Sequence, residues 1–399
     1  MRVSGAGWLL AAAGGLLALG AAEALARWWI RRRGHYYVFP PGLRLLLHPH
    51  PGVFPQLEPS IRFEVNDEGE RGGEVPRPRR GEALYRILVA GGSQPEGYML
   101  DQDTSWPGAL QRLLERPDRL PRLGASRVHV GSIARSGVGS EALGLILERV
   151  LPRYPRLQAI VVLVGASDVL RWLEEGAPPC PPSPPRTPEL FRCHPESAYG
   201  WKPGELALVE LVLRTRRRRL RPVDVHRRAG GWIGRVREMR ARAKVIRTAL
   251  PDPDPMLDHF ERHFRQVLQK AGGHADRVLV VRQPWFHKDC TPEEAALMWH
   301  GGVAQAWRQE VTTYYSLNVL GRLMALLDER AARAAAALGV EQLDLRPFVP
   351  ASLETYYDFF HATPAGARIV GAAVADAILR PGASRPAAAP PACMAARAS

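Results

Sequence analysis

Apolar residues along this chain gather in short runs, and amphipathic stretches separate one run from the next. Five runs of β-forming residues have the length of single strands, at 86–91, 127–132, 159–165, 277–281 and 340–345. The third run is apolar throughout, which is typical of a central strand that is covered on both faces. Because strands alternate with helical stretches, we predict an α/β fold with a parallel, doubly wound sheet of five strands.

The helical stretches begin and end at recognisable residues. The last one has Thr363 as N-cap and Pro364 at its first position, and it ends before Pro381. A second, over 293–338, is predicted as one long helix before the fifth strand. Between the third and fourth strands, an insertion over about 171–275 starts with a proline-rich loop and contains further helical stretches.

The amino-terminal stretch is the most apolar part of the chain. No charge occurs from Val3 to Ala22, and about 20 apolar residues suffice for a helix to cross a bilayer. Trp28 and Trp29 follow where an interfacial aromatic belt is expected, so we predict a transmembrane anchor over 1–33. A cleaved signal peptide, suggested by the small-residue pattern at 24–26, and a buried core helix are the alternatives.

The orientation of this anchor is predicted from two opposing signals. The cluster Arg31–Arg33 favours a cytoplasmic domain, although long domains cross membranes largely regardless of flanking charge. Cys180 and Cys193 bracket the proline-rich loop and could form a disulfide in an exported domain. We therefore expect a membrane-anchored domain outside the cytoplasm.

Around the α/β domain, predicted over 84–380, two segments have a different composition. Residues 34–83 combine aromatic residues with many prolines and glycines and contain one alternating run at 61–65, which predicts an irregular collar with a short strand or hairpin. Residues 381–399 are rich in alanine and proline, and we expect them to be disordered.

The net charge of +14 changes this picture little. Arginine accounts for nearly all of the basic residues and is scattered over the whole chain, and no nucleic-acid-binding motif accompanies it, so we predict no nucleic-acid partner. The run 214–221 could contact anionic lipid or an acidic polymer, but a solvated helix end is the simpler interpretation.

Candidate chemistry lies where the predicted strands end. Ser93 follows the first strand after two glycines, at the sheet edge where open α/β folds bind ligands. A serine hydroxyl needs a base and a group that orients the base, and Asp358 and His361 have the spacing for this just before the last helix. Each motif alone is common, the first in strand-to-loop turns and the second in surface turns.

An oxyanion would also need donors at the same edge of the sheet. The candidates are the N–H groups of Ser93 and Gly137 and the hydroxyl of Ser167, which follow the first three strands. Acyl transfer by a nucleophilic serine therefore becomes the leading hypothesis.

These four blocks resemble those of the SGNH/GDSL hydrolases in order and approximate spacing. The resemblance covers about 85–170 and 275–380 and includes neither the predicted anchor nor the insertion. It implies a flavodoxin-like, three-layer α/β/α sandwich and an esterase without cofactor or metal. It also implies that Ser93 is the nucleophile, His361 the base, Asp358 its orienting partner and Gly137 an oxyanion donor.

Two positions depart from the family pattern. Gly92 replaces the aspartate of Gly-Asp-Ser and affects no catalytic atom, whereas Ser167 replaces an asparagine that would donate to the oxyanion. We therefore expect a serine esterase that acts on an ester of a small molecule, glycan or lipid. An O-acyltransferase of the same fold and an inactive binding or assembly module are the alternatives.

Other motifs are weaker. The segment 137–142 matches the glycine pattern of dinucleotide-binding folds but lies several residues beyond its strand and lacks a ribose-binding acid. His287 and Cys290 have a spacing that metals use, but without a second pair they are better explained by an ordinary loop.

Overall fold

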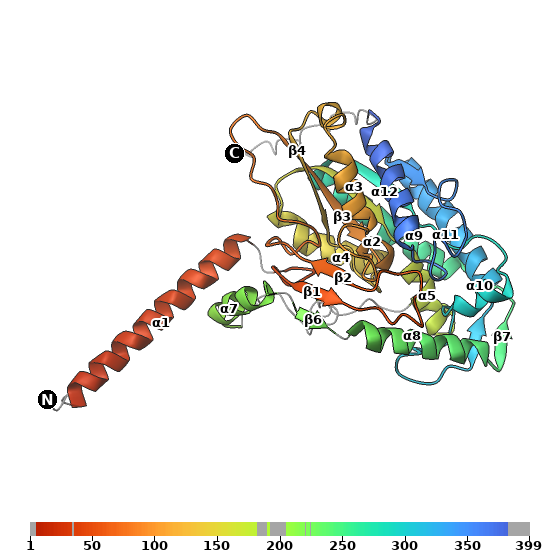
Figure 1. The fold of residues 1–399 in the computed structure, drawn as a ribbon, viewed down its shortest axis with the longest axis horizontal. Helices are drawn as coiled ribbons and strands as arrows, with labels where there is room; N and C mark the ends of the chain where they lie inside the picture. Colours follow the sequence, from red (N-terminus) through yellow and green to blue (C-terminus); the bar gives the residue numbers. More distant parts are fainter. Residues whose placement is uncertain are drawn as a thin grey trace, which may run out of the picture.

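A single parallel sheet organises the chain (Figure 1). The computed structural model describes residues 5–33, 36–181, 190–191, 205–219, 221–223 and 225–381. Five parallel strands lie in the order β10-β8-β5-β3-β4. Their bounds are Leu84–Gly91 (β3), Arg127–Ser132 (β4), Leu157–Leu163 (β5), Ala275–Arg282 (β8) and Glu341–Asp344 (β10).

The strand order determines where a ligand site is expected. The chain passes from β3 to β4 on one side and then crosses back to β5 on the other side of β3. Such a change of direction opens a crevice at the carboxyl ends of the strands, and Ser93 lies directly beyond β3.

Helices cover both faces of the sheet. On one face α3 (Trp106–Leu114) packs against α12 (Pro364–Leu379), and α4 (Ser140–Val150), α9 (Asp254–His274) and α11 (Leu317–Ala337) pack in a row on the other. Gly371 lets α12 approach α3 closely, because a Cβ there would lie 2.9 Å from the Ala109 Cβ. This α/β/α sandwich is the fold that the resemblance implied, and the five-stranded parallel sheet is confirmed.

Helix starts follow the capping residues. The Thr363 hydroxyl accepts a hydrogen bond from the N–H of Gly366, as predicted for the N-cap of α12. The prediction of one long helix over 293–338 is wrong. This segment contains α10 (Pro292–Leu297), strand β9 (Thr313–Tyr315) and α11. The β-branched and aromatic residues 313–315 pair with β7 (Val245–Arg247), and Ser316 then caps a new helix.

The predicted collar contains a small sheet of its own. The alternating run forms β2 (Ile61–Glu64), which pairs antiparallel with β1 (Arg44–Leu47), and β1 pairs with β6 (Arg221–Val223). The remaining elements are the helices α2 (Ser93–Glu96), α5 (Ala166–Glu174), α7 (Ala207–Arg217) and α8 (Val225–Ala241), and the short 3-10 helices Leu120–Leu123 and Leu151–Arg153.

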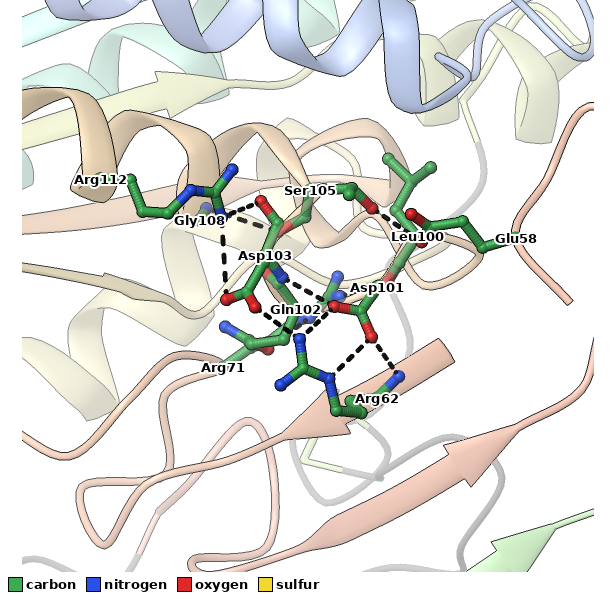
Figure 2. Close-up of polar contacts among 11 residues, drawn as sticks. Glu58, Arg62, Arg71, Leu100, Asp101, Gln102, Asp103, Ser105, Gly108 and Arg112 are labelled. Atoms are coloured by element: carbon green, nitrogen blue, oxygen red, sulfur yellow. Dashed lines mark hydrogen bonds and ion pairs between the residues drawn. The ribbon is translucent and has the colours of Figure 1, made fainter. Parts of the chain in front are cut away.

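Ion pairs bind the collar to the α/β domain (Figure 2). The Arg62 guanidinium on β2 donates to both carboxylate oxygens of Asp101, at 2.7 and 3.0 Å, and also reaches Asp103. Asp101 in turn accepts a hydrogen bond from the Arg62 backbone N–H at 2.7 Å. The segment between α2 and α3 is therefore fixed from the collar side.

The amino-terminal stretch forms helix α1 (Gly5–Arg33), which projects from the body of the molecule (Figure 1). Its Glu23 carboxylate accepts the N–H groups of Ala207 and Leu208 and so caps α7. Within the described residues, no helix combines the length and apolar character needed to cross a membrane. The predicted transmembrane anchor over 1–33 is therefore unsupported, and a location outside the cytoplasm stays a prediction.

Two further predictions lie outside the described residues. Cys180 is a free, exposed cysteine, whereas its suggested partner Cys193 is not described. The tail beyond 381 is not described either.

Candidate active site

The turn that carries Ser93 is built around two glycines. A Cβ on Gly91 would lie 1.9 Å from the carbonyl oxygen of Leu163, so only glycine lets β3 end this close to β5. Gly92 is the N-cap of α2, and its N–H donates to the same Leu163 oxygen at 3.1 Å. Ser93 thus stands at the first position of α2, where helical N–H groups have no partner inside the helix.

Asp358 and His361 lie in one tight turn between β10 and α12. The carboxylate of Asp358 accepts the N–H groups of Phe360 at 2.9 Å and His361 at 2.8 Å, so the backbone holds it in place. Nδ1–H of His361 donates to Asp358 Oδ2 at 2.8 Å, and this assigns the tautomer because a carboxylate only accepts. Nε2 of His361 is then free to act as an acceptor.

The structure brings these residues to Ser93. The distance between Ser93 Oγ and His361 Nε2 is 2.7 Å, with Oγ–H as the donor. A continuous hydrogen-bonded line therefore runs from the Asp358 carboxylate through the imidazole to the serine hydroxyl. This is the geometry that removes a proton from a nucleophile and orients the base that takes it.

Burial and neighbouring charges shift the pKa values of both Asp358 and His361. Asp358 is fully buried. Burial alone would raise its pKa, but the neighbouring imidazoles and its hydrogen bonds bring the pKa well below the usual range. Burial likewise lowers the pKa of His361, yet the Asp358 charge and hydrogen bond outweigh this and leave that pKa raised. The carboxylate thus stays ionised while the imidazole is made more basic.

Two neighbours of Asp358 come from the segment between α10 and β9. Nε1–H of Trp299 donates to Asp358 Oδ2 at 3.0 Å, and the ring of His300 stacks on that of Trp299 with centroids 3.8 Å apart. Burial lowers the pKa of His300 to about 3, so it is neutral at physiological pH. Sequence reasoning missed both residues, since no local spacing links them to Asp358.

The predicted oxyanion donors lie on two further loops. Gly137 has a φ of 76°, a conformation that glycine adopts without strain. Ser167, on α5, is buried, and its Oγ lies 3.7 Å from the position that a Cβ on Gly92 would take. The Ser167 hydroxyl is therefore beside the turn that carries Ser93.

The neighbouring Asp168 fixes these two loops to each other. Its carboxylate accepts the N–H of Ser140 at 2.9 Å and the Ser140 hydroxyl at 2.7 Å. The Gly137 loop ends at Ser140, so its exit is set by the same α5 that carries Ser167. A pocket opens on this side, lined among others by Ser167, Asp168 and Arg171.

A buried pair supports the other side of the turn. Glu96, at the end of α2, accepts the N–H of Ser136 at 2.7 Å and so holds the start of the Gly137 loop. The buried Arg71 guanidinium donates to the carbonyls of Glu96, of Gly97 at 2.7 Å and of Leu100 at 2.6 Å. Sequence reasoning missed Arg71 because it comes from the collar.

Groups that could hold a metal ion occur at two places in the described part of the chain. One combines His300, Asp358 and His361, but both ring nitrogens of His361 already take part in the line to Ser93. The other comprises Glu141, His259 and His263 and is considered below. The sequence pair His287 and Cys290 belongs to neither group.

Comparisons with known proteins show weak structural similarity. No protein-family model matches the chain, and no curated protein matches it. Similar solved structures include Axe2, an acetylxylan esterase from Geobacillus stearothermophilus, with 12% identity, 75% of this chain and 94% of that chain covered, and a TM-score of 0.39. A member of the lipolytic protein G-D-S-L family from Veillonella parvula DSM 2008 has 10% identity, coverage of 75% and 100%, and a TM-score of 0.38.

A third similar structure is LAE5, an alpha/beta hydrolase enzyme from the metagenome of Lake Arreo, Spain. It has 12% identity, coverage of 75% of this chain and 97% of that chain, and a TM-score of 0.39. At these identities and TM-scores, similarity alone establishes no activity for this chain.

Proposed function

We propose that this chain is a serine-dependent ester hydrolase of the SGNH type. The observation that carries the proposal is the unbroken hydrogen-bonded line from Asp358 through His361 to Ser93. Ordinary surface turns do not bring a buried carboxylate, an imidazole and a strand-end hydroxyl within hydrogen-bonding distance of one another at the sheet edge.

In the proposed reaction, Ser93 Oγ attacks the ester carbonyl while His361 Nε2 takes the hydroxyl proton. Asp358 stabilises the imidazolium that forms, and the N–H groups of Ser93 and Gly137 with the Ser167 hydroxyl receive the oxyanion. The proton then passes to the leaving alcohol. Water, deprotonated by His361, hydrolyses the acyl-serine and releases the acid. Expected substrates are esters of small molecules, glycans or lipids.

The direct test compares the wild type with Ser93→Ala on a short-chain aryl ester. We expect the variant to lose at least about 10⁴-fold in kcat, because the nucleophile is absent while the rest of the site remains. A fluorophosphonate probe should label the wild type at Ser93 and leave the variant unlabelled. Ser126→Ala, in an exposed loop, is the matched control and should retain full activity. Equal hydrolysis by wild type and Ser93→Ala, with no labelling, would exclude the proposal.

Ser167 is the observation that favours an alternative, since its hydroxyl is shorter than the amide of the family pattern. An inactive module that binds an acylated partner would leave Ser93 unlabelled by the probe. An O-acyltransferase would be labelled but would pass the acyl group to an added sugar hydroxyl faster than to water. Product analysis with and without a sugar acceptor separates these two alternatives from hydrolysis.

A further inference from the structure

Three side chains of types that commonly bind metals meet where α4 packs against α9. Glu141 comes from the first turn of α4, and His259 and His263 come from α9, which packs against α4. The two histidines are four residues apart and so share one face of their helix. None of the three takes part in the proposed acyl chemistry.

Their donor atoms lie near the separation that a metal requires. His259 Nε2 lies 3.1 Å from one carboxylate oxygen of Glu141, and His263 Nε2 lies 3.9 Å from the other. One ligand atom from each residue falls within 4.8 Å of the others. In a tetrahedral zinc site with bonds of about 2.1 Å, donor atoms lie roughly 3.4 Å apart. Small side-chain rotations would therefore suffice to close the site.

The surroundings allow an ion to enter. The side chains of Glu141, His259 and His263 are 26%, 20% and 18% exposed, so solvent reaches them. Glu141 and His259 also line the pocket beside Ser167, which leaves room for a fourth ligand such as water.

The donor set also limits the choice of ion. Two imidazoles and one carboxylate suit zinc and similar transition metals, whereas calcium and magnesium prefer an all-oxygen shell. Arg171 lines the same pocket, and the charge of Arg262 reaches His263. These two positive charges disfavour a cation that is bound by electrostatic attraction alone. Strong bonds to nitrogen are needed to offset them.

We propose that Glu141, His259 and His263 bind one divalent transition-metal ion, with Zn²⁺ as the best-fitting occupant and a fourth position open to the pocket. The proposal goes beyond the esterase reaction and does not depend on it. A metal here would join α9 of the insertion to α4, which starts directly after the Gly137 loop. It would thereby restrict the loop that carries a candidate oxyanion donor.

The test is a titration of the untagged, chelator-treated full chain with ZnCl₂, followed by calorimetry. We expect one site per chain and a rise in melting temperature with added zinc, because an ion that binds only the folded state stabilises it. Co²⁺ in the same site should give the visible absorption of a tetrahedral nitrogen and oxygen environment. Replacing both histidines (His259→Gln with His263→Gln) should weaken zinc binding by more than about 100-fold. Loss of a single outer-shell partner already costs up to about 100-fold, and this variant removes two direct ligands.

Two control variants isolate the site. His287→Gln changes an exposed histidine elsewhere and should leave zinc binding unchanged. His361→Ala removes the imidazole of the other candidate metal group and should also retain one bound zinc. Loss of zinc in His361→Ala, or full zinc binding by the double variant, would overturn the proposal.

Circular dichroism without metal shows whether each variant folds. If the double variant does not, Glu141→Gln gives the same decision, since its side chain is partly exposed and of the same size. At least about tenfold weaker zinc binding is expected from that change, by comparison with the loss of an outer-shell partner. Unchanged affinity would refute the assignment.

Discussion

The two sides of the candidate active site differ in how firmly their groups are held. On the base side, the Asp358 carboxylate accepts two backbone N–H groups, the Trp299 indole and the His361 ring. On the proposed oxyanion side, the third candidate donor is the Ser167 hydroxyl, which can rotate and is shorter than an amide. The proposed base side is therefore fixed by several hydrogen bonds, whereas the proposed oxyanion side includes one hydroxyl that can rotate.

This difference indicates where rate should be lost when each half is damaged. A fully buried carboxylate with four donors has no substitute when it is removed, because no other anion faces His361 at that distance in the described structure. The two backbone N–H groups proposed as oxyanion donors remain when Ser167 is changed. We therefore expect larger effects on the base side.

Asp358→Asn tests the base side most severely. The amide can leave His361 in the wrong tautomer, and we expect kcat to fall by about 10⁴-fold while the fold is kept. Steady-state kinetics on an aryl ester measures this, with Asp276→Asn, an exposed carboxylate at the start of β8, as the control. A loss of less than tenfold would mean that Asp358 is merely structural.

The pH profile of Asp358→Asn sharpens the same comparison. In the wild type, His361 must be neutral to act as a base, and its pKa is raised by Asp358. Hydrolysis should therefore fall as pH decreases through a value above the ordinary histidine pKa. Removing the Asp358 charge lowers that pKa, so the acid limb of the residual activity should move to lower pH. An unmoved limb would show that another group controls it.

Ser167→Ala tests the oxyanion side. An oxyanion donor typically contributes about 10²–10³ in rate, and we expect this short hydroxyl to contribute less, about 10- to 100-fold in kcat, with little change in KM. The control Ser126→Ala changes a serine far from the pocket. Full activity in Ser167→Ala would show that the Ser167 hydroxyl is not an oxyanion donor and that backbone N–H groups alone stabilise the oxyanion.

Trp299→Phe is the mildest change, because it removes one donor from Asp358 and keeps an aromatic side chain at this position. We expect kcat to fall by about threefold to tenfold at unchanged KM, as for a single lost hydrogen bond. The carboxylate charge is then less neutralised, so the pKa of His361 should rise and the acid limb should move to higher pH, opposite to Asp358→Asn. Trp307→Phe, exposed on the same segment, is the control. If the acid limb of the pH profile does not move, Trp299 contributes only packing and does not affect the pKa of His361.

The features that sequence predicted are those encoded over a few neighbouring residues. Glycines before Ser93, the spacing of Asp358 and His361, and the Thr363 cap are local signals, and the apolar runs identified all five strands of the sheet. Pairings between distant segments were missed, because nothing near Trp299 or Arg71 in the chain indicates the group that it contacts. The four-residue spacing of His259 and His263 was visible, but Glu141 joins them only through the packing of α4 on α9.

The contact between Arg71 and the carbonyls after Ser93 has a consequence for shortening the protein. A fragment starting at β3 would keep every residue of the proposed reaction but lose the guanidinium that gathers the oxygens of Glu96, Gly97 and Leu100. Those carbonyl oxygens would lose their hydrogen-bond donor and be left to water, and the end of α2 would no longer be held by Arg71. The smallest fragment that keeps Ser93 in position therefore includes the collar that precedes β3.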